Sequence, residues 1–158
     1  MIKAAVLTVS DSCSQGERRD VSGQTITDIL TENGYEVCDQ KIVPDDAEAI
    51  SAELISFSDE ADVEIVFTTG GTGLGPRDVT PEATISVCDK LVPVLGELMR
   101  LKGLEKTPNA ILSRSTAGIR NNTLIINLPG SPKAVHQCLE VILNILPHAV
   151  DMMRGRGH

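Results

Sequence analysis

Four small residues in a row, Gly70-Gly71-Thr72-Gly73, follow a predicted strand at Glu64–Thr68. Glycines at such a turn let the backbone present N–H groups without obstruction by side chains, which is a common way to bind a phosphate. Because Pro76-Arg77 follows Gly75, the loop matches neither the P-loop pattern nor the dinucleotide pattern. The loop predicts an anion site of another kind, and a purely structural tight turn is the alternative.

Two aspartates at strand-to-helix junctions are candidates to bind a cation that accompanies such a phosphate. Asp78 lies five residues beyond Gly73, and Asp45 precedes Asp46, the predicted cap of the next helix. If the two carboxylates meet, they form a hard, oxygen-only site suited to Mg²⁺. Spacing along the chain does not decide whether they meet, and Asp78 has the alternative role of offsetting a helix dipole.

Basic residues that could bind phosphate occur in two later segments. The stretch Ile111–Arg120 combines hydroxyl groups with two arginines and has no clear period, so we predict a binding loop. The turn Pro129-Gly130-Ser131-Pro132 leads into a helix, with Lys133 as a further positive charge. Arginines on a solvated surface and a simple turn are the alternatives.

The elements that must position these residues follow an alternating pattern of strands and helices. Strands are predicted at Ala4–Val9, Glu36–Val43, Glu64–Thr68 and Thr123–Leu128. Three of them are nearly continuous apolar runs, which is typical of a parallel sheet covered on both faces. Ligands gather at the carboxyl ends of the strands in such sheets. We therefore expect the loops after the first, third and fourth strands to converge on one edge.

Five helices are predicted between the strands. The bounds are Gly23–Asn33 with Ser22 as cap, Asp46–Ser58, Pro81–Asp89 with Thr80 as cap, Pro93–Lys102 and Pro132–Met153. Pro147 should kink or restart the last of them, because proline lacks the N–H of the helix ladder. The tail at 154–158 is glycine-rich and is expected to be frayed.

Length and composition exclude several classes of function. A chain of 158 residues suits a single domain over residues 1–158. Its formal net charge is −8 and it has only three aromatic residues, so nucleic acid is not an expected partner. No apolar run is long enough for a membrane span, and the chain does not start with a signal-peptide pattern. The four cysteines form no C-x-x-C pair, which favours reduced thiols in a cytoplasmic protein.

Taken together, the motifs resemble those of the MogA and MoaB family of molybdenum-cofactor biosynthesis proteins. The main resemblance is Thr69-Gly70-Gly71-Thr72-Gly73 followed by Arg77-Asp78-Val79-Thr80-Pro81-Glu82-Ala83-Thr84. Three more stretches agree in order, at Leu7–Asp11, Ile111–Arg120 and Asn127–Pro132, so the likeness covers almost the whole chain. It implies a three-layer α/β/α fold around a mostly parallel sheet, a homotrimer, and binding of molybdopterin.

The resemblance is greater to MogA and to the G domain of the plant protein Cnx1, which implies a specific activity. That activity is transfer of AMP from Mg·ATP to the terminal phosphate of molybdopterin, giving adenylylated molybdopterin and pyrophosphate. ATP and molybdopterin are then the substrates and Mg²⁺ the cofactor. Molybdopterin synthase would act upstream and a molybdate-insertion protein downstream.

The resemblance also implies roles for particular residues. Asp45 and Asp78 are the implied catalytic acids and Mg²⁺ ligands. The implied contacts to pterin and nucleotide are Ser10, Asp11, Gly70, Gly71, Thr72, Gly73, Ser113, Asn127, Pro129 and Gly130. Arg77, Arg114 or Lys133 would offset the charge that develops during transfer.

Two other functions fit parts of the sequence. One is a MoaB-like protein that binds or carries molybdopterin without adenylylating it. The other is a phosphate-sensing regulatory domain of flavodoxin-like shape with Asp45-Asp46 as an acidic pocket, which leaves the motifs at Ser113–Arg120 and Asn127–Pro132 unexplained.

Overall fold

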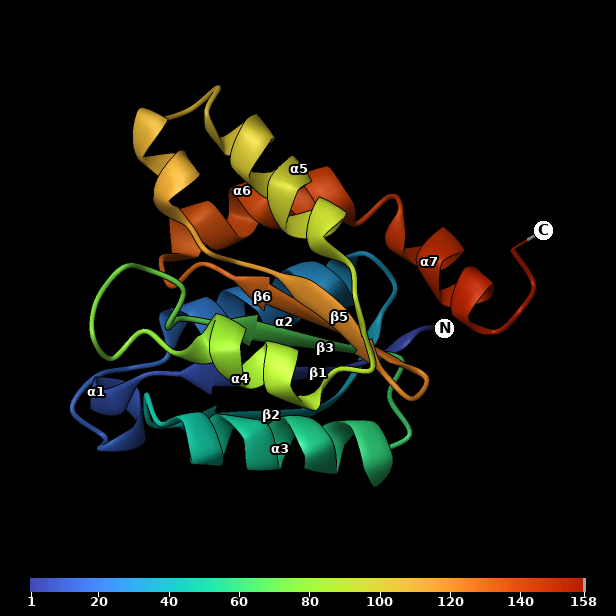
Figure 1. Cartoon of the computed structure of the whole chain (residues 1–158), viewed down its shortest axis with the longest axis horizontal. Helices are drawn as coiled ribbons and strands as arrows, with labels where there is room; N and C mark the ends of the chain where they lie inside the picture. The colour runs from blue at the N-terminus through green and yellow to red at the C-terminus, as the bar shows by residue number, and fades with distance from the viewer. Residues whose placement is uncertain (158) are drawn as a thin grey trace.

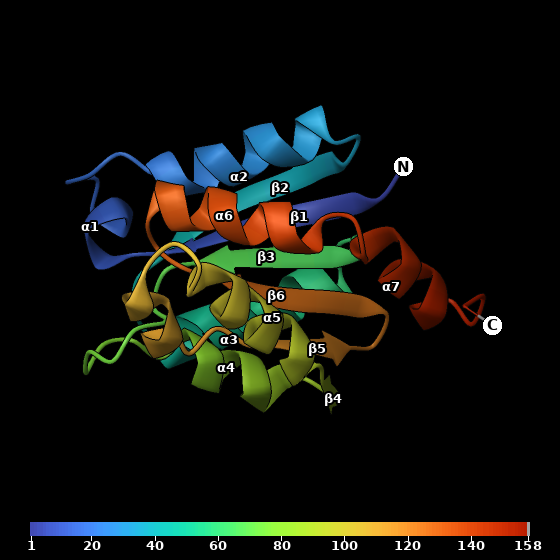
Figure 2. The same cartoon turned by 90° about the horizontal axis from the view of Figure 1, so that it is seen from above.

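The computed structural model describes residues 1–157 and shows one six-stranded sheet between two layers of helices (Figure 1). In chain order the strands are β1 (Lys3–Val9), β2 (Glu36–Val43), β3 (Ile65–Thr69), β4 (Lys90–Leu91), β5 (Ala117–Arg120) and β6 (Thr123–Leu128). Their order across the sheet is β2-β1-β3-β6-β5-β4 (Figure 2). Strands β2, β1, β3 and β6 are parallel, whereas β5 pairs antiparallel with β6 on one side and with β4 on the other. The predicted three-layer fold with a mostly parallel sheet is confirmed.

Two separate apolar cores hold the helices against the sheet. Along β1, Ala4 and Val6 face one core while Ala5 and Leu7 face the other, because side chains alternate along a strand. The first core joins the sheet to α2 (Val21–Glu32), α5 (Pro93–Gly103), α6 (Pro132–Ile142) and α7 (Leu146–Met153). The second core joins it to α3 (Ala47–Asp59) and α4 (Thr80–Val87). Both faces of the sheet are thus dry, as the apolar strands predict.

Two strands and two short helices were not expected from the sequence. The segment predicted as a binding loop at Ile111–Arg120 instead contains the end of the 3₁₀ helix η1 (Pro108–Leu112) and all of β5. A tight turn joins β5 to β6, and Asn121 adopts a φ of 52° there. Asparagine tolerates this left-handed conformation, so Asn121-Asn122 between two apolar runs was a readable hairpin signal. The four-residue helix α1 (Asp11–Ser14) follows β1 directly.

The predicted helix caps are right at one position and wrong at two. Asp46 caps α3 through a bond from the Ala49 amide, as predicted. Helix α2 begins at Val21 and is capped by Asp20, not by Ser22, because the Asp20 carboxylate accepts the Gly23 amide. Thr80 is the first residue of α4 and not its cap, since its hydroxyl donates to the Gly70 carbonyl instead.

The last predicted helix is two helices. Helix α6 ends at Ile142, and α7 begins at Leu146 with Pro147 in its first turn, where a missing N–H costs nothing. The expected restart at Pro147 is therefore confirmed. An ion pair between Arg154 and Glu64 holds the end of α7 against the sheet. Within residues 1–157, no helix combines the length and apolar character that a membrane crossing requires.

Candidate functional site

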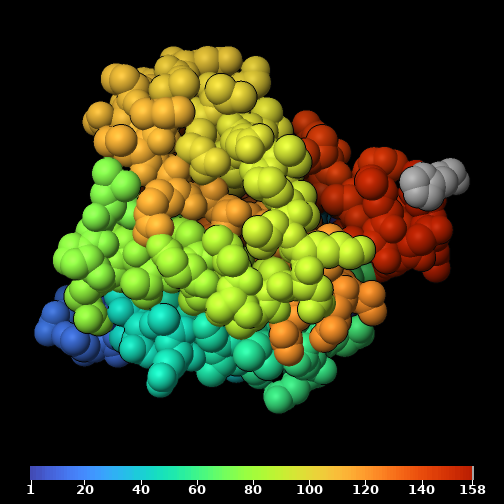
Figure 3. All heavy atoms as spheres, in the orientation of Figure 1, coloured from blue at the N-terminus to red at the C-terminus, as the bar shows by residue number. Residues whose placement is uncertain are grey.

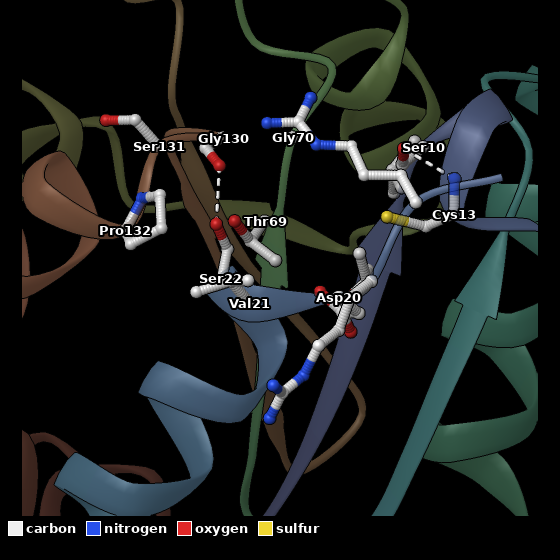
Figure 4. A pocket seen from close by; sticks show the side chains of 14 residues that line it. Ser10, Cys13, Asp20, Val21, Ser22, Thr69, Gly70, Gly130, Ser131 and Pro132 are labelled. Atoms are coloured by element: carbon white, nitrogen blue, oxygen red, sulfur yellow. Dashed lines mark hydrogen bonds between the residues drawn. The ribbon is translucent and has the colours of Figure 1, made fainter.

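The three loops at the carboxyl ends of β1, β3 and β6 meet around one cavity of about 380 Å³ (Figure 4). Ser10 follows β1, Gly70 follows β3, and Gly130-Ser131-Pro132 follows β6, and all of them line the cavity. A hydrogen bond of 2.6 Å from the Ser22 hydroxyl to the Gly130 carbonyl fixes the last loop against α2. The predicted convergence of the three loops on one edge is confirmed.

The turn after β3 requires glycine at two successive positions. Gly70 has a φ of 95° and Gly71 a φ of 70°, and both values are strained for any other residue. A side chain at Gly70 would lie 2.3 Å from the Val9 carbonyl oxygen, and one at Gly71 would lie 2.2 Å from the Thr80 hydroxyl. The Gly70 amide is already bonded to the Leu128 carbonyl. The next three amides, Gly71 to Gly73, have no acceptor within residues 1–157, so they remain free for an anion.

Asp11 and Asp45 are locked together at the ends of β1 and β2. Each backbone amide donates to the other residue's carboxylate at 3.0 Å. Arg77 adds two bonds to the Asp11 carboxylate, at 2.6 and 3.0 Å, and one to the Asp45 carbonyl. These bonds lower the pKa of Asp11 below its ordinary value. Arg77 therefore braces this junction, a role different from the predicted neutralisation of substrate charge.

Asp45 and Asp78 both pack against the glycine-rich loop. One Asp45 oxygen lies 3.3 Å from the position of a side chain at Gly71, and the Asp78 carboxylate accepts the Gly75 amide at 2.8 Å. Burial raises the pKa of Asp45 above its ordinary value, and the negative charges of Asp11 and Asp78 act in the same direction. The two aspartates are thus close enough to interact electrostatically.

Arg114 fastens the far side of the same loop. Its guanidinium donates to the Gly73 carbonyl and to the Asp78 carbonyl, each at 2.7 Å, and pairs with the Glu82 carboxylate. Its backbone amide bonds the Thr72 carbonyl. Arg114 is consequently committed to holding the loop in shape. Lys133 is exposed at the start of α6.

Asn127 lies inside the protein and not on the surface of the cavity. Its side chain is fully buried within β6 and donates to the hydroxyls of Thr68 and Thr84, at 3.0 and 2.9 Å. The Thr116 amide donates to its carbonyl oxygen. This arrangement links the end of β6 to β3 and α4, so the structure places Asn127 as a support for the loops.

A second cavity of about 450 Å³ lies between α5, η1 and α6, and Ser113 and Pro129 line it. Its walls also include Met99, Cys138 and Val141, so it is more apolar than the first cavity. Pro129 borders the second cavity and Gly130 the first, which means that one turn separates the two spaces.

Several residues that line the first cavity were not predicted from the sequence. Arg18, Arg19 and Asp20 line it, although they belong to a loop that carries no recognised motif. The available signal was a pair of arginines directly before the start of a helix. Arg120, by contrast, was predicted in a binding loop but pairs with Asp59 at the opposite end of the sheet. The antiparallel course of β5 carries it there.

Comparisons with known proteins agree with this geometry. The family profile described as probable molybdopterin binding domain matches residues 5–148. A protein named molybdopterin adenylyltransferase from Helicobacter pylori J99 is 47% identical over 157 residues, covering 98% of this chain and 89% of the relative. The protein of the same name from Escherichia coli K12 is 36% identical over 156 residues, covering 94% and 80%.

The solved structures include a close match in shape. The molybdopterin biosynthesis enzyme MoaB from Thermus thermophilus superposes with a TM-score of 0.92 at 47% identity, covering 98% of each chain. The match spans the loops that form both cavities as well as the sheet. On these grounds the chain belongs to the family of probable molybdopterin binding domains.

Proposed function

We propose that this protein is a molybdopterin adenylyltransferase, which transfers AMP from ATP to the terminal phosphate of molybdopterin and releases pyrophosphate. Relatives named for this activity align with nearly the whole chain. The structural observation that carries the proposal is the placement of Asp45 and Asp78 against one glycine-rich loop. Carboxylates from separate loops beside free amides suit a nucleotide bound with a metal ion.

The donor set fits Mg²⁺. Both candidate ligands are carboxylate oxygens. Burial, and after it the negative charges of Asp11 and Asp78, raise the pKa of Asp45, and a bound cation would relieve both effects. Within residues 1–157 no group of three His, Cys, Asp or Glu residues is placed to hold a metal. Mg²⁺ commonly takes only one or two carboxylates and fills its other positions with phosphate oxygens and water. When bound, it would polarise the phosphates of ATP.

The chain's own part in the reaction is positioning and charge stabilisation. An oxygen of the molybdopterin phosphate attacks the α-phosphorus, and the bond to the bridging oxygen breaks so that pyrophosphate leaves with the electron pair. The free amides of Gly71, Thr72 and Gly73 can donate to a phosphate oxygen in this step. Ser10 at the first cavity and Ser113 at the second provide hydroxyls to orient the two substrates. Arg77 and Arg114 keep the loops rigid.

The test is to incubate the protein with molybdopterin, ATP and Mg²⁺ and to measure adenylylated molybdopterin and pyrophosphate in equal amounts. The second candidate function, binding or carriage of molybdopterin without transfer, is favoured by the likeness to the protein named MoaB. Binding of molybdopterin with no pyrophosphate release would support that alternative.

The proposed reaction also implies its neighbours in the pathway. A molybdopterin synthase must act before this step to supply molybdopterin, and a molybdate-insertion protein must act after it. All four cysteines are free, which fits a cytoplasmic setting.

We also propose a homotrimer. Exposed apolar side chains occur on β4, α5 and η1, and Figure 3 shows the α5 and η1 segments above α4. These exposed side chains are Leu91, Val94, Leu101, Leu104, Ile111 and Leu112. Exposed apolar patches of this kind mark sites of association. Light scattering should give a mass about three times 16.9 kDa, and Leu101→Glu should lower it, whereas a monomeric wild type would refute the trimer.

A further inference from the structure

The first cavity has a positively charged wall that the proposed reaction does not yet use. Arg18 and Arg19 both line the cavity and both are exposed. Within residues 1–157, neither guanidinium forms an ion pair or a side-chain hydrogen bond. This sets them apart from Arg77, Arg114 and Arg120, which are all bound to carboxylates. Two arginines without protein partners thus lie in the wall of one cavity.

The nearby acid, Asp20, forms no ion pair with either arginine. Asp20 also lines the cavity, but one of its carboxylate oxygens accepts the Gly23 amide at 2.9 Å and the other accepts the Thr8 hydroxyl at 2.7 Å. Asp20 is therefore occupied as the cap of α2 and as an anchor of that helix to β1. Neither carboxylate oxygen of Asp20 accepts a hydrogen bond from an arginine within residues 1–157.

The remaining walls also favour an anion. The cavity is bordered by the first residues of two helices, Val21 and Ser22 of α2 and Pro132 of α6, whose dipoles attract negative charge. Figure 4 shows Ser22, Ser131 and Pro132 of these two helix starts around the cavity. The whole chain carries a formal charge of −8, so an anionic substrate needs such a local concentration of positive charge.

We propose that Arg18 and Arg19 bind a phosphate group of one substrate in this cavity. The planar guanidinium fork of each arginine donates two parallel hydrogen bonds to phosphate oxygens, so each of these exposed side chains can bind a multiply charged phosphate. The inference deepens the proposed function and rests on it for the identity of the substrate. The phosphate belongs either to the nucleotide or to molybdopterin, and both sources share the same chemistry.

Direct binding of inorganic pyrophosphate and of inorganic phosphate, measured by calorimetry, tests the proposal without any turnover. The variant is Arg18→Gln with Arg19→Gln. The control is Lys90→Gln with Arg156→Gln, which removes the same charge at exposed positions outside the cavity. Loss of charged hydrogen bonds should weaken binding by about tenfold or more in the variant, and the control should bind like the wild type. Equal thermal unfolding midpoints would show that both variants fold.

Steady-state kinetics then identifies the source of the phosphate. A rise of about tenfold in the KM for ATP assigns the arginines to the nucleotide, and a similar rise for molybdopterin assigns them to the acceptor. Unchanged affinity for both inorganic ions in the double variant would overturn the proposal, even if the enzyme is active. A wild type that binds pyrophosphate through these arginines but makes no adenylylated product would instead refute the proposed function and leave the phosphate site standing.

Discussion

Asp11 and Asp45 exchange hydrogen bonds, each backbone amide donating to the other's carboxylate at 3.0 Å. This reciprocal pair ties the end of β1 to the end of β2 and fixes the direction of the Asp45 carboxylate. The carboxylate is held close to Gly71 at the cost of its burial and of repulsion from Asp11 and Asp78. Such a balance, with stability sacrificed for a placed negative charge, is typical of functional sites.

Asp45→Asn should separate activity from stability. The amide keeps an oxygen to accept the Asp11 N–H but removes a negative charge that its surroundings disfavour. We expect the thermal unfolding midpoint at pH 7, without substrates, to equal or exceed that of the wild type. Turnover should fall by about 10²-fold or more, which corresponds to about 3 kcal/mol. A variant with normal turnover would exclude Asp45 as a metal ligand.

Gly71→Ala should destabilise the protein more than Gly34→Ala. The two glycines have similar φ values, 70° and 82°, so both substitutions incur the left-handed penalty of about 1–2 kcal/mol. Only at Gly71 does the new methyl group also meet Thr80, at 2.2 Å, while nothing lies within 4 Å at Gly34. Urea unfolding should show a further loss of about 1 kcal/mol or more for Gly71→Ala. Equal losses would mean that the loop moves freely.

Asn127→Ala should act through stability. Its buried amide bonds Thr68 and Thr84, so its removal leaves a cavity and breaks these hydrogen bonds. Urea denaturation should show a loss of about 2 kcal/mol or more in the free energy of unfolding. Ser113→Ala, in the wall of the second cavity, is the control and should change stability much less. If Asn127→Ala unfolds like the wild type yet is inactive, then Asn127 contacts substrate directly.

The ion pair between Asp59 and Arg120 lies at the end of the sheet remote from the site. It should make the stability of the protein depend on pH. Bonds from Arg120 lower the pKa of Asp59 below its ordinary value of 3.8. A lowered carboxyl pKa contributes stability above the ordinary value, and this contribution disappears as the pH falls through the folded-state pKa. Asp59→Asn should therefore melt below the wild type at pH 7, with the gap closing below pH 3.8.

Thermal melts from pH 7 to pH 3 provide that measurement. Glu97→Gln, an exposed substitution on α5, is the matched control. Its unfolding midpoint should differ from that of the wild type by the same amount at every pH. A gap for Asp59→Asn that stays constant across the range would show that the ion pair contributes nothing through ionisation.

The parallel core of the fold was predictable because its signals are local. Apolar runs marked β1, β3 and β6, and Asp46 marked the start of α3. The short edge strand β4 and its partner β5 were not predictable in the same way, since two and four residues carry no period. Their pairing depends on β6, which is a tertiary effect.

The location of the candidate site could be predicted from the sequence, but the roles of its individual side chains could not. Spacing showed that Arg77, Arg114 and Asn127 lie near functional loops, yet their hydrogen-bond partners come from 11 to 66 residues away in sequence. For Arg18 and Arg19, even the location was not predicted. They sit in no motif and enter the cavity wall only because α2 is packed against the ends of β1 and β6.

Anomalous diffraction from crystals grown with Mn²⁺ and a non-hydrolysable ATP analogue would show whether Asp45 and Asp78 share one metal ion. We predict a single manganese peak in contact with both carboxylates, directly or through one water, and with phosphate oxygens of the analogue. A peak bound to neither aspartate, or the two carboxylates turned to separate ligands, would contradict the account.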